Sequence, residues 1–324
     1  MAVEELTSIE QLQAIERAWS DLWQQDPLAT PFQSPQWVLP WIRHFASGEI
    51  LTVAIRENGR LDAIAPCFIL RDEDDPSESL GMLLGTGNSD YVDMLRAPDA
   101  AIDPVVDRLA AADCAMWDLQ QLRVSSALLH VPAPPQWSDE VEDHDVCLVL
   151  SLDDLGDATS THFRKKLRYY RRSLEREGRL SIETPTADSI DEFMTALFDL
   201  HAARWKKRGL PGMLAAEVDQ SFHRDVARGM LADGALRMYA MRLNDRIVAM
   251  FYGFANHGTV YYYLSGYDPA LEKFSPGTVI VAHAVEEAVR DGAQTFDFLR
   301  GAEDYKYAWG ATDRMNKRRR LIRG

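Results

Sequence analysis

Ser275-Pro276-Gly277-Thr278 is the first stretch of the sequence whose residue types suggest chemistry. It lies between a predicted strand and a predicted helix. A glycine in a strand-to-helix turn lets an anion approach the backbone, and the free N–H groups of the first helical turn complement its charge. The stretch is therefore a candidate pyrophosphate site. Pro and Gly also punctuate ordinary loops and helix starts, so the motif alone leaves both interpretations open.

Polar and charged residues gather at the exit of a second predicted strand, within FDFLRGAEDYKYAWG at 296–310. They are Arg300, Glu303, Asp304, Tyr305 and Lys306. Glu303 could serve as a general base if an apolar wall raised its pKa. A structural ion pair among Arg300, Glu303 and Lys306 fits the same spacing equally well.

A helix predicted at 163–177 has one apolar and one basic face. Its apolar residues recur at steps of three and four, and Gly178 supplies the stop. The opposite face carries Arg164, Lys165, Arg168, Arg171 and Arg172. Such a face could bind a polyanion, such as a nucleotide phosphate or tRNA, through bidentate Arg contacts. It is also typical of a solvated helix surface.

The residue types at 85–93 predict an exposed, turn-rich loop in the first half of the chain. The loop contains Asp90, Tyr91 and Asp93. Its Gly, Asn and Ser residues are those of an Asx-turn loop that caps strands. The sequence therefore leaves open whether this loop binds a ligand or only caps strands.

Several kinds of catalysis are disfavoured by what the sequence lacks. His201 falls with Phe198 and Trp205 on the apolar side of a predicted helix, which is more typical of a hydrogen-bonded core histidine than of a base. The sequence contains no Ser-His-Asp order, nucleophile elbow, Walker loop or HExxH motif, and its three cysteines form no CxxC pair. We therefore expect neither an acyl-enzyme nor a metal site.

Periodicity and turn signals predict the elements that position these residues. In the first half they indicate a helix after Ser8, a hairpin turning at Asn58-Gly59, a helix at 103–112, and strands at 117–123 and 145–152. In the second half they indicate the basic helix, helices at about 188–207 and 217–232, a three-stranded antiparallel meander from 236 to 267, another helix and two strands. The order is α/β, with a boundary near 150–160.

Composition and charge narrow the function further. The 324 residues are 46% hydrophobic and 26% charged, which is typical of a folded globular protein and not of a disordered one. The net charge of −15 divides into −21 for residues 1–160 and +6 for residues 161–324. A DNA-binding surface along the whole chain is therefore not expected, and an anionic ligand is expected in the second half. The acidic N-terminus and the lack of a long apolar run predict a cytoplasmic protein without a membrane span.

The meander, the SPG loop, the following helix and FDFLRGAEDYK together resemble a known family. PFQSPQWVLPWIRHF, LGTGNSDYVDML, FRKKLRYYRRSLEREG and YYYLSGYDPALEKFSPGTVI occur in the order expected for it. The chain is similar to the GNAT-superfamily acyltransferases of the BioF2-like, cellulose-biosynthesis CelD (BcsL) group. That group is related to the Fem aminoacyltransferases of peptidoglycan synthesis.

The resemblance implies two tandem GNAT-like domains with mixed, largely antiparallel sheets flanked by helices. Residues 1–155 would form an N-terminal domain without a donor site, and residues 156–324 a C-terminal domain that binds acetyl-CoA or another acyl-CoA. The pyrophosphate would lie at Ser275, Pro276, Gly277 and Thr278. The pantetheine would run along the strand from Tyr261 to Gly266, past Leu264. A GNAT phosphate loop usually reads Q/R-x-x-G-x-G/A, and of that signature this chain keeps only Gly277.

The implied chemistry is direct transfer of the acyl group to an amine, without a covalent enzyme intermediate. Glu303 or Asp297 would be the base or orient the amine, and Tyr305 would protonate the leaving thiolate. Arg300 and Lys306 would bind an anionic acceptor or stabilise the fold. Asp90, Tyr91, Asp93 and Arg168 complete the predicted substrate-binding set. The family's naming suggests an amine or amino sugar of cell-envelope or exopolysaccharide metabolism as acceptor.

Two alternatives stand beside this hypothesis. A Fem-like transferase would take its donor from aminoacyl-tRNA, which the basic second half allows. A non-catalytic GNAT-like scaffold would bind a partner only, because a fold alone does not establish activity.

Overall fold

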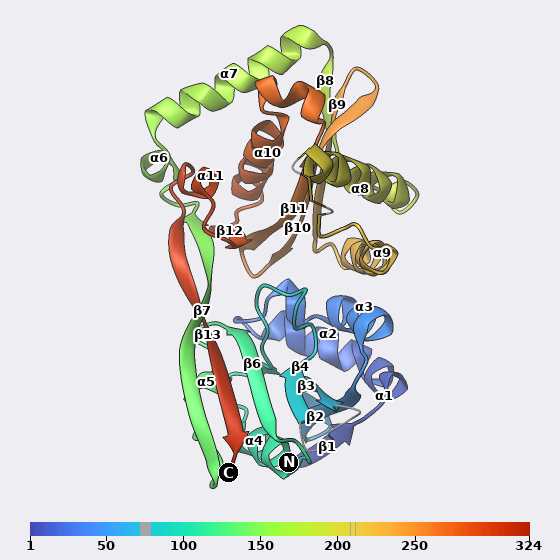
Figure 1. Cartoon of the computed structure of the whole chain (residues 1–324), viewed down its shortest axis with the longest axis vertical. Helices are drawn as coiled ribbons and strands as arrows, with labels where there is room; N and C mark the ends of the chain where they lie inside the picture. Colours follow the sequence, from blue (N-terminus) through green and yellow to red (C-terminus); the bar gives the residue numbers. More distant parts are fainter. Residues whose placement is uncertain (72–78, 208, 211) are drawn as a thin grey trace. The chain divides into compact units, whose positions relative to one another are not determined.

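The computed structural model describes residues 1–71, 79–207, 209–210 and 212–324, and the side chains of all of these except residues 157 and 158. It divides the chain into two compact units (Figure 1). Unit 1 comprises Met1–Val146 and Met315–Gly324, and unit 2 comprises Cys147–Arg314. This division differs from the predicted boundary after residue 155. It also assigns the C-terminal residues to unit 1. Both crossings fall inside long strands, β7 (Trp137–Ser151) and β13 (Thr312–Arg323), so no linker composition marks them.

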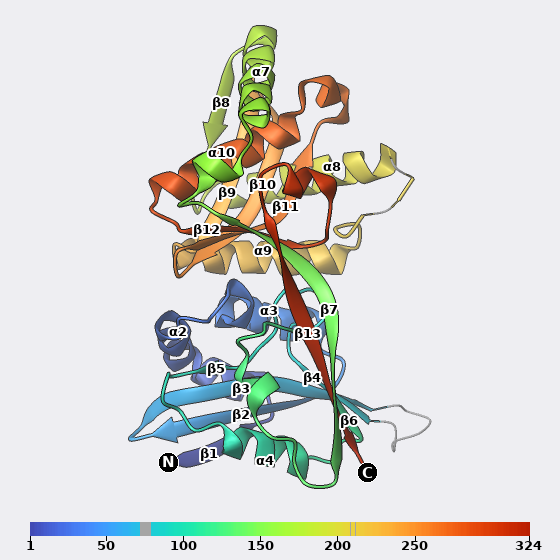
Figure 2. The same ribbon diagram turned by 90° about the vertical axis from the view of Figure 1, so that its left-hand side faces the viewer.

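Unit 1 is a sheet with helices on both faces. Its other strands are β1 (Ala2–Leu6), β2 (Glu49–Glu57), β3 (Arg60–Arg71), β4 (Ser79–Leu83), β5 (Leu95–Arg96) and β6 (Met116–Leu122). Its helices are α1 (Ile9–Ala14), α2 (Glu16–Gln25), the 3-10 turn η1 (Pro31–Gln33), α3 (Pro35–Phe45), α4 (Asp103–Ala111) and α5 (Ala127–His130). The strand order is β1-β2-β3-β4-β6-β13, and β5 pairs with β3. Helices α2 and α3 cover one face and α4 the other (Figure 2).

The predicted hairpin and first helix are present in unit 1. Strands β2 and β3 pair antiparallel around Asn58 and Gly59, whose φ angles of 52° and 81° suit a tight hairpin turn. Ser8 caps α1 by accepting a hydrogen bond from the Gln11 N–H, but the helix breaks at Ile15 into α1 and α2. Strand β1, which pairs with β2, was not predicted because its five residues carry little strand pattern.

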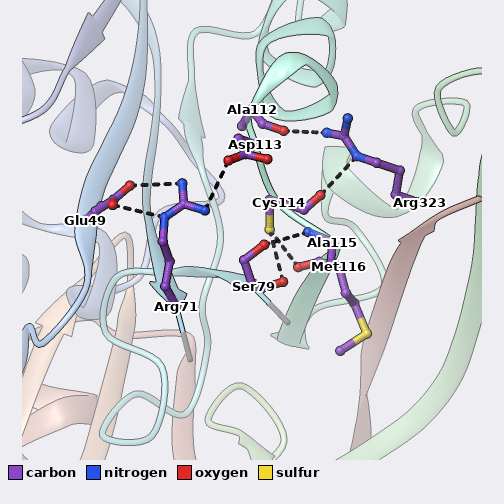
Figure 3. Close-up of polar contacts among 9 residues, drawn as sticks. All are labelled: Glu49, Arg71, Ser79, Ala112, Asp113, Cys114, Ala115, Met116 and Arg323. Carbon is purple, nitrogen blue, oxygen red and sulfur yellow. Dashed lines mark hydrogen bonds and ion pairs between the residues drawn. The ribbon is translucent and has the colours of Figure 1, made fainter. Parts of the chain in front are cut away.

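A polar cluster in unit 1 joins the end of β3 to the loop before β6 (Figure 3). Arg71 donates to Glu49 at 3.0 Å and to Asp113 at 3.3 Å. The Cys114 thiol donates to the Met116 carbonyl at 3.0 Å, and Arg323 donates to the Cys114 carbonyl at 3.1 Å. All three cysteines of the chain are free and buried, as predicted for small core residues.

Unit 2 contains the sheet β7-β12-β11-β10-β9-β8. Its strands besides β7 are β8 (Leu180–Glu183), β9 (Leu236–Leu243), β10 (Arg246–Asn256), β11 (Thr259–Tyr267) and β12 (Thr295–Arg300). Its helices are α6 (Leu155–Ala158), α7 (Thr161–Glu177), α8 (Ile190–Lys207), α9 (Glu217–Ala232), the 3-10 segment η2 (Pro269–Phe274), α10 (Pro276–Arg290) and α11 (Asp304–Tyr307). The predicted basic helix, both helices after it and the antiparallel meander β9-β10-β11 are confirmed.

Helices cover both faces of the sheet in unit 2. Helix α10 lies on one face with α7 packed against it, and α8 and α9 lie on the other (Figure 1). The core between α10 and the sheet is rich in aromatic rings, among them Phe251, Phe296 and Phe298. None of the described helices is both long and apolar enough to cross a membrane.

The basic C-terminal residues do not serve unit 2. Strand β13 pairs with β6 of unit 1. Arg318 donates to Asp118 at 2.6 and 2.8 Å, and Arg319, which is 2% exposed, donates to Asp139 at 2.9 and 2.8 Å. By sequence, unit 1 then carries 26 acidic and 13 basic residues, and unit 2 carries 24 and 22. The net charge of +6 holds for residues 161–324, but unit 2 itself is nearly neutral, because the five basic residues of 315–324 belong to unit 1.

Candidate active site

Strands β11 and β12 separate within unit 2. They pair in parallel from Thr259 to Tyr261 against Thr295 to Asp297, although β11 continues to Tyr267 and β12 to Arg300. Where two parallel strands part, their edges offer backbone N–H and C=O groups to a ligand. The separation therefore makes this part of β11 a binding edge in principle.

A bulge in β11 turns two hydroxyl groups toward the same side. The register with β10 shifts after Tyr252, which makes Tyr263 the extra residue. Tyr262 and Ser265 are three residues apart, and without the bulge they would point to opposite faces. Their hydroxyl oxygens lie 2.5 Å apart.

A cavity of about 350 Å³ lies beside the bulge, within unit 2. Its walls come from α7, α8, β11, the start of α10, and the segment around α11. The lining residues are Phe163, Lys166, Tyr170, Arg204, Tyr262, Ser265, Tyr267, Ser275, Gly277, Thr278, Val281, Tyr305, Ala308 and Trp309. Three residues of the predicted pyrophosphate motif and the predicted acid Tyr305 are therefore brought together in one cavity.

The SPGT motif forms the N-terminus of α10, as the sequence predicted. Ser275 has left-handed backbone angles of φ 51° and ψ 52°, and Pro276 is the first helical residue. The N–H groups of Thr278 and Val279 donate to the Ser275 carbonyl at 3.0 and 3.2 Å. The N–H of Gly277 belongs to the first helical turn, where donors have no partner four residues earlier. The positive end of α10 therefore lines the cavity.

Gly277 is also required by close packing. A Cβ atom at this position would lie 2.9 Å from Cδ1 of Tyr267, closer than normal packing allows. The glycine thus lets the helix start approach the Tyr267 ring. This local cradle fits a phosphate group held by backbone N–H groups.

The tyrosine hydroxyls of the cavity are acids that stay protonated. Burial, reinforced by Tyr262 and Glu303, raises the pKa of Tyr305 far above its ordinary value. Burial also raises the pKa of Tyr262, although the Ser265 hydrogen bond acts in the opposite direction. Both groups are neutral near pH 7 and can donate a proton or a hydrogen bond.

Two cations line the cavity that sequence reasoning did not assign to a site. The guanidinium of Arg204 lies 5.4 Å from the centre of the Tyr267 ring, and the ammonium of Lys166 lies 5.6 Å from that of Tyr170. Arg204 continues the buried stripe of α8 one turn beyond His201. A charged residue in the path of an apolar stripe was the sequence signal that could have identified it.

His201 is a core histidine, which agrees with the preferred sequence interpretation. It is 3% exposed, and its Nε2 accepts a hydrogen bond of 2.8 Å from the Trp205 indole. Burial, and secondarily the charge of Arg204, lower the pKa of His201 to about 4. The imidazole is therefore neutral and adds no charge beside the cavity.

The two predicted carboxylate bases are not among the residues that line the cavity. Asp297 is fully buried, accepts a hydrogen bond of 2.8 Å from the Leu299 N–H, and lies 3.5 Å from the guanidinium of Arg314. Glu303 is 55% exposed and pairs with Lys306 at 2.8 Å. Glu303 remains electrostatically linked to the cavity because its charge acts on Tyr305.

Lys306 and Arg300 belong to the loop that follows β12. The ammonium of Lys306 donates to the carbonyls of Arg300, Leu299 and Gly301, of which the first lies at 2.5 Å. Together with Glu303, these partners all lie between residues 299 and 303. This geometry is that of the structural ion pair named as the alternative interpretation. A substrate-binding role for either residue stays a prediction.

Three other predicted residues lie outside the cavity lining. A Cβ on Gly266 would meet the backbone N of His201 at 2.8 Å, so Gly266 serves the packing of α8 on β11. Leu264 lies opposite Tyr252 in the ladder between β10 and β11. Arg168 lines a smaller hollow of about 90 Å³, formed mainly between α7 and α10.

The loop at 85–93 of unit 1 is not exposed as predicted. Ser89, Asp90 and Tyr91 are buried, because the Trp37 indole donates to Ser89 at 2.9 Å and Gln33 donates to the Tyr91 carbonyl at 3.0 Å. Asp93 accepts from the Met94 N–H and the Ser126 hydroxyl at 2.8 and 2.9 Å. Burial raises the pKa of Asp93 to about 6, against the charge of Arg123. An acceptor-binding role for Asp90, Tyr91 and Asp93 stays a prediction.

Comparison with known families agrees with the geometry of unit 2. Residues 161–307 match the family model described as an acetyltransferase (GNAT) domain. This chain contains a GNAT acetyltransferase domain. The match covers α7 through α11 and therefore every residue that lines the cavity except Ala308 and Trp309. No curated protein matches the sequence of the chain.

Solved structures share the fold of this chain at low sequence identity. FemX aligns with a TM-score of 0.68 and 12% identity over 98% of this chain and 97% of its own. A conserved protein of unknown function from Bacteroides thetaiotaomicron aligns with a TM-score of 0.67 and 13% identity, covering 99% and 100%. L-PGS from Bacillus licheniformis aligns with a TM-score of 0.57 and 12% identity, covering 87% and 86%.

These likenesses establish the fold and leave the subgroup as a prediction. The predicted fold class, tandem GNAT-like units with mixed sheets flanked by helices, is confirmed. Assignment to the BioF2-like or CelD group stays a prediction. Among the described residues, no group of His, Cys, Asp and Glu side chains has the arrangement of a metal site.

Proposed function

We propose that unit 2 transfers an acyl group from acyl-CoA to an amine. The observation that carries this proposal is the cavity itself, which combines the N-terminus of α10, the edge of β11 and the hydroxyl of Tyr305. These are the parts that thioester aminolysis requires: an anion site for the donor, a channel for its arm, and a proton donor for the leaving sulfur.

In this proposal the chain's own residues have the following roles. The N–H of Gly277 binds the pyrophosphate of the donor, and Ser275 and Thr278 line the same place. Backbone groups of β11 beyond Tyr261 hold the pantetheine arm. Tyr305 donates its proton to the thiolate, a role that its place in the cavity lining allows, since the hydroxyl is protonated at neutral pH.

The amine must lose a proton before or during its attack on the thioester carbonyl. We propose Glu303 for this step, acting through water, because its charge acts on the Tyr305 hydroxyl. Asp297 is less suited, since it is buried and engaged by Leu299 and Arg314. The family resemblance suggests that the acceptor is an amine or amino sugar of envelope or exopolysaccharide metabolism. In this proposal the enzyme acts in the cytoplasm.

Release of free thiol from acetyl-CoA in the presence of an amine library tests the proposal. We expect Tyr305→Phe to lower turnover by about 10²-fold or more, the usual effect of losing a general acid. Tyr307→Phe is the matched control, because Tyr307 is two residues away, donates to Asp313 and is not among the lining residues. Equal turnover of the two variants would contradict the assigned role of Tyr305.

A donor carried on RNA is a second candidate, and α7 favours it. Within the described chain no carboxylate partner is recorded for Lys165, Arg168 or Arg172, and Tyr169 beside them is 61% exposed. Exposed cations next to an aromatic ring suit a single-stranded phosphate backbone. Charge reversal at Arg168 and Arg172 should then abolish a salt-sensitive complex with tRNA. Absence of any such complex for the unmodified protein would remove this candidate.

A further inference from the structure

Arg204 lines the cavity with donors that the described part of the protein does not use. Its Nε is buried from solvent and has no hydrogen-bond partner among the described residues. Its guanidinium lies over the Tyr267 ring, 5.4 Å from the ring centre. The acids Glu272 and Glu303 pair with Lys207 and Lys306 instead.

Arg204 is half-buried, and a buried guanidinium N–H such as its Nε–H is unusual and costly without an oxygen partner. Its five N–H groups form a fork that matches the two oxygens of a carboxylate, and a buried donor without a partner loses its hydration uncompensated. The cavity around it also presents the hydroxyls of Tyr262, Ser265 and Tyr305. A cation beside hydroxyl donors in one cavity is an arrangement that an oxyanion completes.

The position of Arg204 separates it from the start of α10. Both lie against the Tyr267 ring, since a Cβ built on Gly277 would lie 2.9 Å from its Cδ1 and the Arg204 guanidinium lies 5.4 Å from the ring centre. Two anion sites of different character therefore border one aromatic ring. The first is built from backbone N–H groups, and the second from a side-chain fork next to the Tyr305 hydroxyl.

We propose that Arg204 binds the carboxylate of the acceptor, so that the acceptor is an amino acid or a similar amine that bears a carboxylate. The inference rests on the proposed acyl transfer, because it assigns the second anion site to the molecule that receives the acyl group. A phosphate of the donor could bind Arg204 through the same oxyanion chemistry. The experiment must therefore distinguish the acceptor carboxylate from the donor phosphate.

Paired probes that differ in one charge test this inference by calorimetry with the full chain. N-acetylglycine is the product of acetyl transfer to an amino acid, and N-acetylglycinamide is its neutral counterpart. We expect the unmodified protein to bind N-acetylglycine at least ten-fold more tightly than the amide. Arg204→Gln should remove that preference and leave the affinities for CoA and inorganic pyrophosphate within two-fold.

Arg228→Gln is the control, because it removes a cation of the same unit that pairs with Asp191 outside the cavity, and it should change neither measurement. The inference is overturned if the unmodified protein binds neither probe at 50 mM, or shows no preference for the carboxylate. It is also overturned if Arg204→Gln weakens CoA and pyrophosphate instead, which would assign Arg204 to the donor. Failure of the unmodified protein to bind CoA would refute the proposed function separately.

Discussion

Replacing Gly277 by Asp and by Asn separates charge from shape at the proposed pyrophosphate site. Both side chains place a Cβ 2.9 Å from Tyr267 Cδ1, so both share a packing cost of about 1–3 kcal/mol unless the ring moves. The Asp variant alone adds a negative charge beside the helix N-terminus. The difference between the two variants therefore measures the charge of whatever group binds there.

The expected difference follows from Coulomb's law. A carboxylate about 5 Å from one phosphate charge, at an effective dielectric constant of about 20, is repelled by about 3 kcal/mol. That energy corresponds to an affinity for CoA about 100-fold lower in Gly277→Asp than in Gly277→Asn. Salt should shrink the difference, because exposed charges are screened.

Isothermal titration with CoA at about 0.05 M and 0.5 M salt provides the measurement. Circular dichroism of both variants checks that the fold is retained. Equal affinities of the Asp and Asn variants at low salt would refute the reasoning, since a pyrophosphate at this helix start must respond to the added charge.

Three further predictions concern stability. Asp93→Asn should remove a pH dependence of the unfolding free energy. In the unmodified protein the folded-state pKa of Asp93, about 6, exceeds the ordinary value of 3.8. The unfolding free energy is therefore highest below about pH 4 and falls by up to about 3 kcal/mol as the pH rises through 6. Urea unfolding of both proteins at pH 4 and pH 7.5 checks this, and the same change in unfolding free energy with pH in the variant as in the unmodified protein would contradict it. Ser275→Gly should raise the melting temperature of unit 2 by a few degrees, because glycine adopts the left-handed backbone conformation of Ser275 without its strain of about 1 kcal/mol. A lower melting temperature would mean that the serine side chain stabilises the turn. Lys306→Met should cost about 3 kcal/mol in unfolding free energy yet leave CoA affinity unchanged, because its recorded partners belong to its own loop; lost affinity with intact stability would restore it as a binding residue.

The sequence predicted most elements because local signals dominate them. Asn58-Gly59 fixes the β2–β3 hairpin, and the stripe ending at Gly178 fixes α7. Strand β1 was not predicted, because its five residues show too little alternation of polar and apolar side chains. The unit boundary escaped for another reason, since it crosses β7 and β13 in mid-strand and leaves no linker.

The local backbone of the candidate site could be predicted where geometry follows from residue type. A glycine after a proline at a strand-to-helix turn indicated the α10 start directly. Side-chain partners did not follow from spacing, so the sequence could not tell that Lys306 serves its own loop or that Asp297 meets Arg314 from β13. Arg204 was overlooked because it lines a cavity between α8, β11 and α10, which are distant in sequence.

The central claim is that unit 2 takes its acyl group from acyl-CoA, and direct calorimetric titration of the unmodified protein with acetyl-CoA tests it. The account predicts saturable binding of one acetyl-CoA per chain in the micromolar range, about −8 kcal/mol, weakening as salt is raised. Free CoA and desulfo-CoA should bind comparably, because the pyrophosphate and pantetheine supply the contacts. Absence of binding by all three ligands at low salt would contradict the account and shift the assignment to a donor carried on RNA or to a non-catalytic scaffold.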